Sequence, residues 1–153
     1  MPCGRAAGVS RPRQRTLSAS VLAAIAAGGT VGTGARHGVA LLLPVPSTTA
    51  FPWPTFWTNT AGSFLLGLIL PLLLERLPVA RHLRLFLATG LLGSFSTFST
   101  FALEIDLLAR GGRPGLAAAY ALTTVAAGLG AVSIGIAAAR TLPLYAARQR
   151  SRR

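Results

Sequence analysis

Residues 90–104 read GLLGSFSTFSTFALE, and this stretch decides the fold. Its first twelve residues hold two glycines, five hydroxyl side chains and three phenylalanines, although they lie within a long apolar run. An unbroken helix over residues 83–108 would be roughly 39 Å long, against about 30 Å of hydrocarbon in a bilayer. We therefore expect a strong tilt or a break. Gly90 and Gly93 mark the expected break near the bilayer midplane, where the hydroxyls can satisfy freed backbone groups.

Three further apolar runs, residues 17–43, 55–74 and 116–139, are long enough to cross a bilayer, which takes about 20 helical residues. The connections between the runs are short and rich in proline and glycine. Apolar residues make up 52% of the 153-residue chain, and its mean hydropathy is +0.57. We predict an all-α integral membrane protein with four transmembrane helices in residues 17–139, a basic arm in residues 1–16 and a basic tail in residues 140–153.

The net charge of +12 comes from arginine alone, because the chain has no lysine. With four spans, 12 arginines fall on the side of the two termini, and only Arg110 and Arg113 fall on the other, or three residues if Arg36 is counted. This bias predicts that both termini of a multi-pass protein of the cell inner (plasma) membrane are cytoplasmic. It also argues against nucleic acid as the partner and favours contact of the basic tail with anionic headgroups.

The sequence also bears on two other possibilities, a cleaved secretory signal at the N-terminus and an enzyme. A basic stretch followed by LSASVLAAIAA resembles a secretory signal, but apolar character resumes at residues 39–43, which favours a retained first helix. The chain has three acidic residues, two histidines and one cysteine, Cys3, in the arm. We therefore expect no disulfide, no thiolate metal site and no catalytic constellation, and predict that the protein is not an enzyme.

Polar side chains gather on one face of the third span. At 100° per residue, Gly93, Thr97, Thr100 and Glu104 lie within about 60° of one another, and Phe98 and Phe101 share the neighbouring stripe. On the second span, Asn59 is either a hydrogen-bonding contact between helices or a source of amide donors for an anion.

The first and fourth spans carry similar four-residue spacings. Small residues at Ala24, Gly28 and Gly32 predict a helix-packing face that leads to Arg36. That arginine is either an interfacial residue or a group that draws an anion toward a pore mouth. On the fourth span Tyr120 precedes Thr124 by one turn and, taken alone, is typical of an interfacial anchor.

These stretches together resemble the CrcB, or Fluc, family of fluoride channels. Residues 90–104 are similar to the family's third-helix motif G-x-x-G-G-x-T-T-F-S-T-F-S-x-E, and residues 52–67, PWPTFWTNTAGSFLLG, to P-x-G-T-L-x-x-N-x-x-G-S-F-x-x-G. Gly28, Gly29, Gly32 and Arg36 match G-G-x-x-G-x-x-x-R in the first helix. The chain departs from these motifs at Ser94, Ser96, Ala102 and Pro54.

The resemblance implies an antiparallel (inverted) dimer of four-helix subunits that conducts fluoride passively and so lowers the cytoplasmic fluoride concentration. A structural sodium ion at the dimer axis would be held by the backbone carbonyls of Gly93 and Ser96. Arg36 would lie near a pore mouth. The pore residues that the resemblance implies are Asn59, Phe98, Phe101, Tyr120 and Thr124, with Thr97, Ser99, Thr100 and Glu104 near a polar track.

Such a pore suits fluoride chemically. Fluoride is a small, strongly hydrated hydrogen-bond acceptor, so a pore must replace its water with donors and avoid a fixed charge that would trap it. Amide and hydroxyl groups supply donors, and the positive edges of phenyl rings add weak attraction. Several weak sites along a narrow path favour conduction over retention.

The charge bias also bears on the dimer partner. A subunit that inserts in both orientations should show little bias, so we predict that this chain pairs with a second homologous subunit of opposite orientation rather than with itself. Two alternatives to a fluoride channel remain. A small multidrug-resistance-type exporter would need an acidic residue in the first helix, which has none. A non-transporting membrane assembly subunit would use every polar residue for packing.

Overall fold

The computed structural model describes residues 18–75 and 81–141. The predicted arm of residues 1–16 and most of the predicted tail lie outside them. The helices are α1 (Ala19–Leu42), α2 (Trp53–Glu75), α3 (Arg81–Arg84), the π-helix η1 (Leu85–Leu92), α4 (Gly93–Phe95), α5 (Phe98–Arg110) and α6 (Pro114–Thr141). All secondary structure in the described residues is helical, and α3, η1, α4 and α5 together form the third of four long helical segments.

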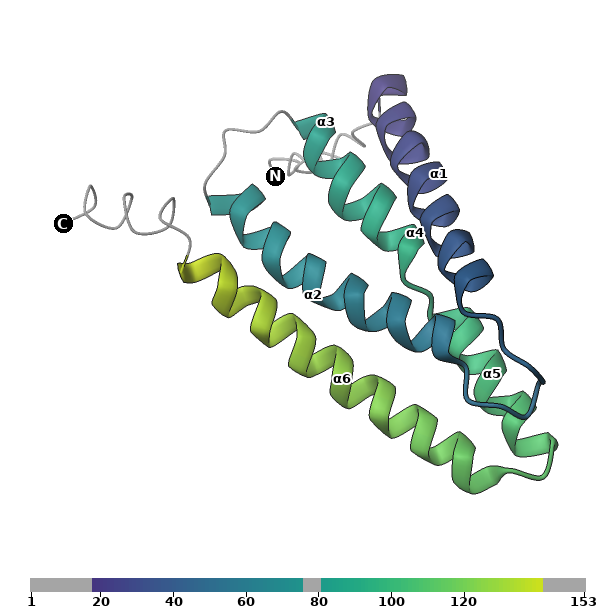
Figure 1. The fold of residues 1–153 in the computed structure, drawn as a ribbon. Coiled ribbons are helices and arrows are strands. Elements are labelled where there is room, and N and C mark those ends of the chain that lie inside the picture. The colour runs from purple at the N-terminus through teal and green to yellow at the C-terminus, as the bar shows by residue number, and fades with distance from the viewer. Residues whose placement is uncertain (1–17, 76–80, 142–153) are drawn as a thin grey trace, which may run out of the picture.

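The helices associate as two parallel pairs, which Figure 1 shows side by side. One pair is α1 with the α3–η1–α4 segment, and the other is α2 with α6. The second half of the broken helix, α5, leaves its own pair and packs on α6. Before the break the third helical segment packs on α1, and after the break it packs on α6 (Figure 1).

Glycines set the close approach within both pairs. Gly28 and Gly32 of α1 are buried against the backbone of η1, and a Cβ atom at Gly90 would lie 2.6 Å from the carbonyl oxygen of Ile25. Gly67 and Gly135 make the equivalent contact between α2 and α6. Helices in lipid associate through packing rather than a hydrophobic driving force, and small residues permit it. The packing face predicted on the first helix is confirmed at Gly28 and Gly32.

The third helix does break, but the predicted position of the break is wrong. Gly90 and Gly93 both lie within continuous helical turns, whereas Ser96 and Thr97 have extended backbones, with ψ of 156° and 122°. Gly90 is instead required by the close approach of α1. The π-helix η1 lies before the break, separated from it by α4, and π-helical turns are frequent at functional sites.

Three described segments are long and apolar enough to cross a membrane: Trp53–Leu73, Arg81–Arg110 and Pro114–Thr141. The 24-residue helix α1 is not among them, because glycines, threonines, Arg36 and His37 lower its hydropathy. It nevertheless lies along the α3–η1–α4 half of the third span (Figure 1).

A small apolar core joins α5 to α6 near the loop that precedes α2. Its buried members are Phe101, Leu108, Ala117 and Tyr120. Phe51, from the α1–α2 loop, packs edge-on against Tyr120 with ring centroids 5.2 Å apart. The core fixes the position of α5 relative to α6, and with it the polar residues of both helices.

Candidate functional site

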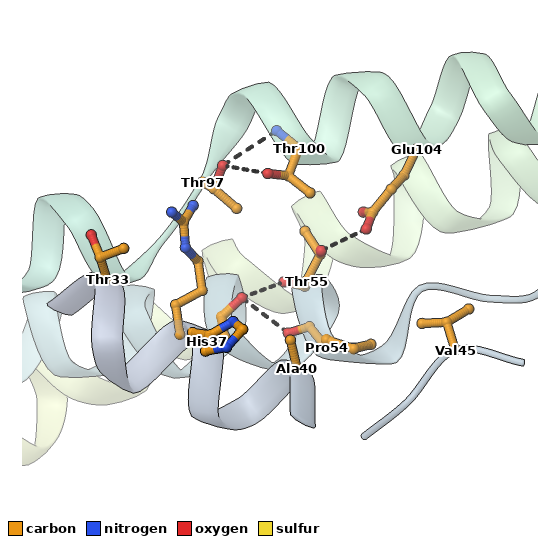
Figure 2. A pocket seen from close by; sticks show the side chains of 11 residues that line it. Thr33, His37, Ala40, Val45, Pro54, Thr55, Thr97, Thr100 and Glu104 are labelled. Atoms are coloured by element: carbon orange, nitrogen blue, oxygen red, sulfur yellow. Dashed lines mark hydrogen bonds between the residues drawn. The ribbon is translucent and has the colours of Figure 1, made fainter. Parts of the chain in front are cut away.

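Thr97 is the N-cap of α5 and the last residue of the break. Its Oγ1 accepts a hydrogen bond from the backbone amide of Thr100 at 3.3 Å and lies 3.1 Å from the Thr100 hydroxyl, which is the usual geometry of a helix N-cap. Figure 2 shows both bonds. The backbone of Thr97 is paired across the helices, because Asn59 Oδ1 accepts from its amide at 2.8 Å and Asn59 Nδ2 donates to its carbonyl at 3.1 Å.

A groove of about 330 Å³ lies between α2, α5 and α6. Asn59, Phe98, Phe101 and Thr124 line it together with Ser63 and apolar residues of α6. The rings of Phe98 and Phe101 are 6.0 Å apart, but their exposures differ, because Phe98 is 80% exposed and Phe101 only 9%. Thr124 is 5% exposed, and its Oγ1 has no hydrogen-bond partner among the described residues. No charged side chain of residues 18–75 and 81–141 lines this groove.

Glu104 joins three helices through its carboxylate. Its Oε1 accepts from Thr55 Oγ1 of α2 at 2.8 Å, and its Oε2 accepts from the hydroxyl of Tyr120 of α6 at 2.7 Å. Tyr120 is fully buried, and its ring lies 5.3 Å from that of Phe101. Tyr120 therefore connects the aromatic groove to the carboxylate, and it is not the interfacial anchor that its position alone suggested.

The other side of Glu104 faces a pocket of about 450 Å³, shown in Figure 2. α1 contributes Arg36 and His37 to its wall, and hydroxyl groups come from α1, from α2 and from the start of α5. The hydroxyl-bearing residues are Thr33, Thr55, Thr58, Thr97 and Thr100. A guanidinium group and several donors thus share one hollow with a carboxylate.

The break also frees carbonyl groups. In an unbroken helix the amides of Thr97 and Thr100 would pair with the carbonyls of Gly93 and Ser96, but they donate to Asn59 and to Thr97 Oγ1 instead. Gly93, Ser96 and Ser99 line an open depression of about 320 Å³ together with Arg36. Phe98 lines both this depression and the groove, whereas Ser99 lines the depression and not the groove.

The predicted site residues other than Tyr120 line three neighbouring hollows, and Arg36, Thr97 and Phe98 each line two of them. Asn59, Phe98, Phe101 and Thr124 share the groove, and Arg36, Thr97, Thr100 and Glu104 share the pocket. Thr55, Thr58 and Phe51 were missed as site residues. The spacing of Thr55 and Asn59 by four residues on one helix was the signal that could have found Thr55. No cluster of three or more metal-ligating His, Cys, Asp or Glu side chains occurs in residues 18–75 and 81–141.

A family model described as CrcB-like protein, Camphor Resistance (CrcB), matches residues 23–136. The chain belongs to the CrcB/FluC family. It is 44% identical over 124 residues to fluoride-specific ion channel FluC 3 of Streptomyces avermitilis. The matched region covers 81% of this chain but only 60% of that protein. It is 40% identical to FluC of Chelativorans sp., covering 75% of this chain and 92% of the relative. It is 43% identical to FluC 1 of Mycobacterium tuberculosis, and the matched region covers 74% of this chain and 85% of the relative.

Membership of the CrcB/FluC family confirms the resemblance found in the three helix motifs. The protein is a multi-pass membrane protein of helical fold, as predicted. The relatives are named as ion channels, which supports the prediction that this protein is not an enzyme.

Proposed function

We propose that the chain is a subunit of a passive, fluoride-selective channel that lets fluoride leave the cytoplasm down its electrochemical gradient. One observation supports this most strongly: Asn59, Phe98, Phe101 and Thr124, from three helices, line one uncharged groove. A path that replaces the water of a small anion needs donors without a trapping charge, and this groove has that composition.

The groove offers two donors that protein groups do not use. Asn59 Nδ2 carries two hydrogens and donates one to the Thr97 carbonyl, which leaves the second for an ion. The Thr124 hydroxyl is buried and has no partner among the described residues. An unpaired hydroxyl in a membrane is costly, so a ligand or water that accepts from it stabilises the site. The rings of Phe98 and Phe101 add their positive edges.

The path continues from the groove through Tyr120 to the pocket beyond Glu104. Thr55 and Tyr120 both donate to the carboxylate, which holds these hydroxyls in fixed positions. Arg36, in the wall of the pocket, lies where a cation would draw an anion toward the mouth of the path. The Thr97 hydroxyl donates to Thr100 Oγ1, which leaves the hydrogen of the Thr100 hydroxyl as a further donor in the pocket.

The freed carbonyls fit a structural sodium ion. Sodium is a hard cation that binds oxygen, and the carbonyls of Gly93 and Ser96 have both lost their helical partners. We propose that these two carbonyls and the same pair from a partner subunit hold the ion at the dimer axis. The ion would neutralise carbonyl dipoles that meet there, and the substitution of serine at position 96 leaves the carbonyl ligand intact.

We propose that the partner has the opposite orientation and is a second homologous subunit. Phe98 is 80% exposed beside a groove that a partner helix could cover. The arginine bias of this chain argues for one orientation, with both termini in the cytoplasm. Tags at the two termini test this directly. We expect both tags to be protected from a reagent added outside the cell. Labelling of the tags on about half the molecules would contradict a single orientation.

The proposed function is tested by fluoride efflux from proteoliposomes that hold the chain alone or with a candidate partner subunit. We expect fluoride efflux with the partner present and at least a hundredfold less chloride efflux. Equal passage of chloride, or no fluoride flux from either preparation, would contradict a fluoride channel and would favour the exporter or the assembly subunit.

A further inference from the structure

We propose that Asn59 is a positioning residue that clamps the backbone of the broken helix, so that its side chain shapes the groove as well as lining it. Asn59 makes two hydrogen bonds to a single residue. Asn59 Oδ1 accepts from the Thr97 amide at 2.8 Å, and Asn59 Nδ2 donates to the Thr97 carbonyl at 3.1 Å. One carboxamide thereby pairs with both polar backbone groups of the residue at the break.

The break creates the need for such a partner. Ser96 and Thr97 have extended backbones, so the Thr97 amide does not pair with the carbonyl of Gly93. The Thr97 carbonyl, as that of the N-cap, can accept the first bond of α5 and has a second lone pair for another donor. An unpaired backbone group in hydrocarbon costs several kcal/mol, and there is little water to satisfy it. A carboxamide carries an acceptor and a donor in the arrangement of a peptide group, so it can satisfy both. Asn59 is the only asparagine in the chain, and both glutamines, Gln14 and Gln149, lie outside the described residues.

The path of α2 brings this side chain to the break. Gly62, almost one turn beyond Asn59, is buried, and a Cβ atom there would lie 3.2 Å from Cβ of Ser96. The glycine lets α2 lie against the extended residues, and the asparagine then bridges to their backbone. The two residues of α2 together define where the third span changes direction.

The clamp also positions the helix that begins after the break. Thr97 is the N-cap of α5, so its location sets the start of that helix and the placement of Phe98 and Phe101. The clamp also diverts the Thr97 amide from the carbonyl of Gly93, which becomes free for another ligand. The loss of Asn59 should therefore disturb both the groove and the carbonyls of the break, which a residue that only contacts an ion would not do.

Residue-resolved amide hydrogen exchange of the chain in lipid nanodiscs tests the clamp without any transport assay. We expect the Thr97 amide to exchange slowly although it lies outside a helix. Asn59→Ala should speed its exchange about five- to tenfold, which is the effect expected from loss of one net hydrogen bond. Asn59→Asp keeps the acceptor for the Thr97 amide, so exchange there should stay close to the wild-type rate.

Thr60→Ala is the matched control, because Thr60 is the neighbouring residue of α2 and its hydroxyl has no partner among the described residues. It should leave exchange at Thr97 unchanged. Unchanged exchange at Thr97 in Asn59→Ala would overturn the clamp. If Asn59→Ala does not fold, a wild-type Thr97 amide that exchanges as fast as an unstructured one would overturn it. This result is independent of fluoride flux, so the clamp and the proposed channel can fail separately.

Discussion

The hydroxyl of Tyr120 donates to Glu104 at 2.7 Å while its ring packs against Phe101, so one buried side chain joins the aromatic groove to the carboxylate. The two contacts can be separated by mutation. Tyr120→Phe keeps the ring and removes the donor, which leaves Thr55 as the remaining hydroxyl on the carboxylate.

We expect Tyr120→Phe to fold and to lose roughly 1 kcal/mol of stability, the typical net value of one hydrogen bond. Fluoride flux should fall because Glu104, which lines the pocket, is held less firmly once this donor to its carboxylate is removed. Thermal unfolding in detergent and efflux from liposomes measure the two effects. Wild-type flux in this variant would show that the Tyr120 hydroxyl lies outside the path.

Phe98 and Phe101 should respond differently to truncation. Phe98 is 80% exposed in the subunit, so Phe98→Ala should leave the subunit fold intact and suppress flux. Phe101 is in the core, and Phe101→Ala should destabilise the subunit by about 3–5 kcal/mol. Unfolding of each variant should be measured beside its fluoride efflux. A folded Phe98→Ala variant with normal flux would remove Phe98 from the pore.

The glycines of α1 offer a matched pair for helix packing. Gly32 is buried against the backbone of Leu91, whereas a Cβ atom at Gly34 would meet nothing within 4 Å. Gly32→Ala should therefore separate α1 from η1 and reduce the yield of folded protein. Gly34→Ala should be neutral or stabilising, because alanine is favoured over glycine in a helix by about 1 kcal/mol. Equal behaviour of the two variants in size-exclusion chromatography would contradict this packing.

Much of the fold can be read from local patterns that the sequence displays. Apolar runs of sufficient length predict the helices, and the excess length of the third run predicts a break. The small residues Gly28 and Gly32 predict a packing face, because close approach of two helices in lipid requires them. The spacing of Phe98, Phe101 and Glu104 places polar and aromatic stripes side by side on one helix.

The position of the break could not be predicted in this way, because it depends on a contact between residues far apart in the chain. The glycines of the third run suggested a break at Gly90 and Gly93, whereas the helix ends where Asn59 can pair with the backbone of Thr97. The bond from Thr55 to Glu104 and the packing of Phe51 on Tyr120 are similar, since each joins separate elements. Periodicity within one helix carries no information about such partners.

The path through the groove is tested most directly by a pair of neighbouring threonines on α6. Thr124 is buried in the groove with a hydroxyl that has no partner in the described part of the chain, whereas the exposed Thr123 hydroxyl donates to the carbonyl of Ala119 in its own helix. Replacement by valine keeps the shape of each side chain and removes the hydroxyl. In proteoliposomes that hold the complete dimer, Thr124→Val should reduce fluoride efflux at least tenfold and Thr123→Val should leave it unchanged. Equal efflux from both variants would contradict a fluoride path through this groove.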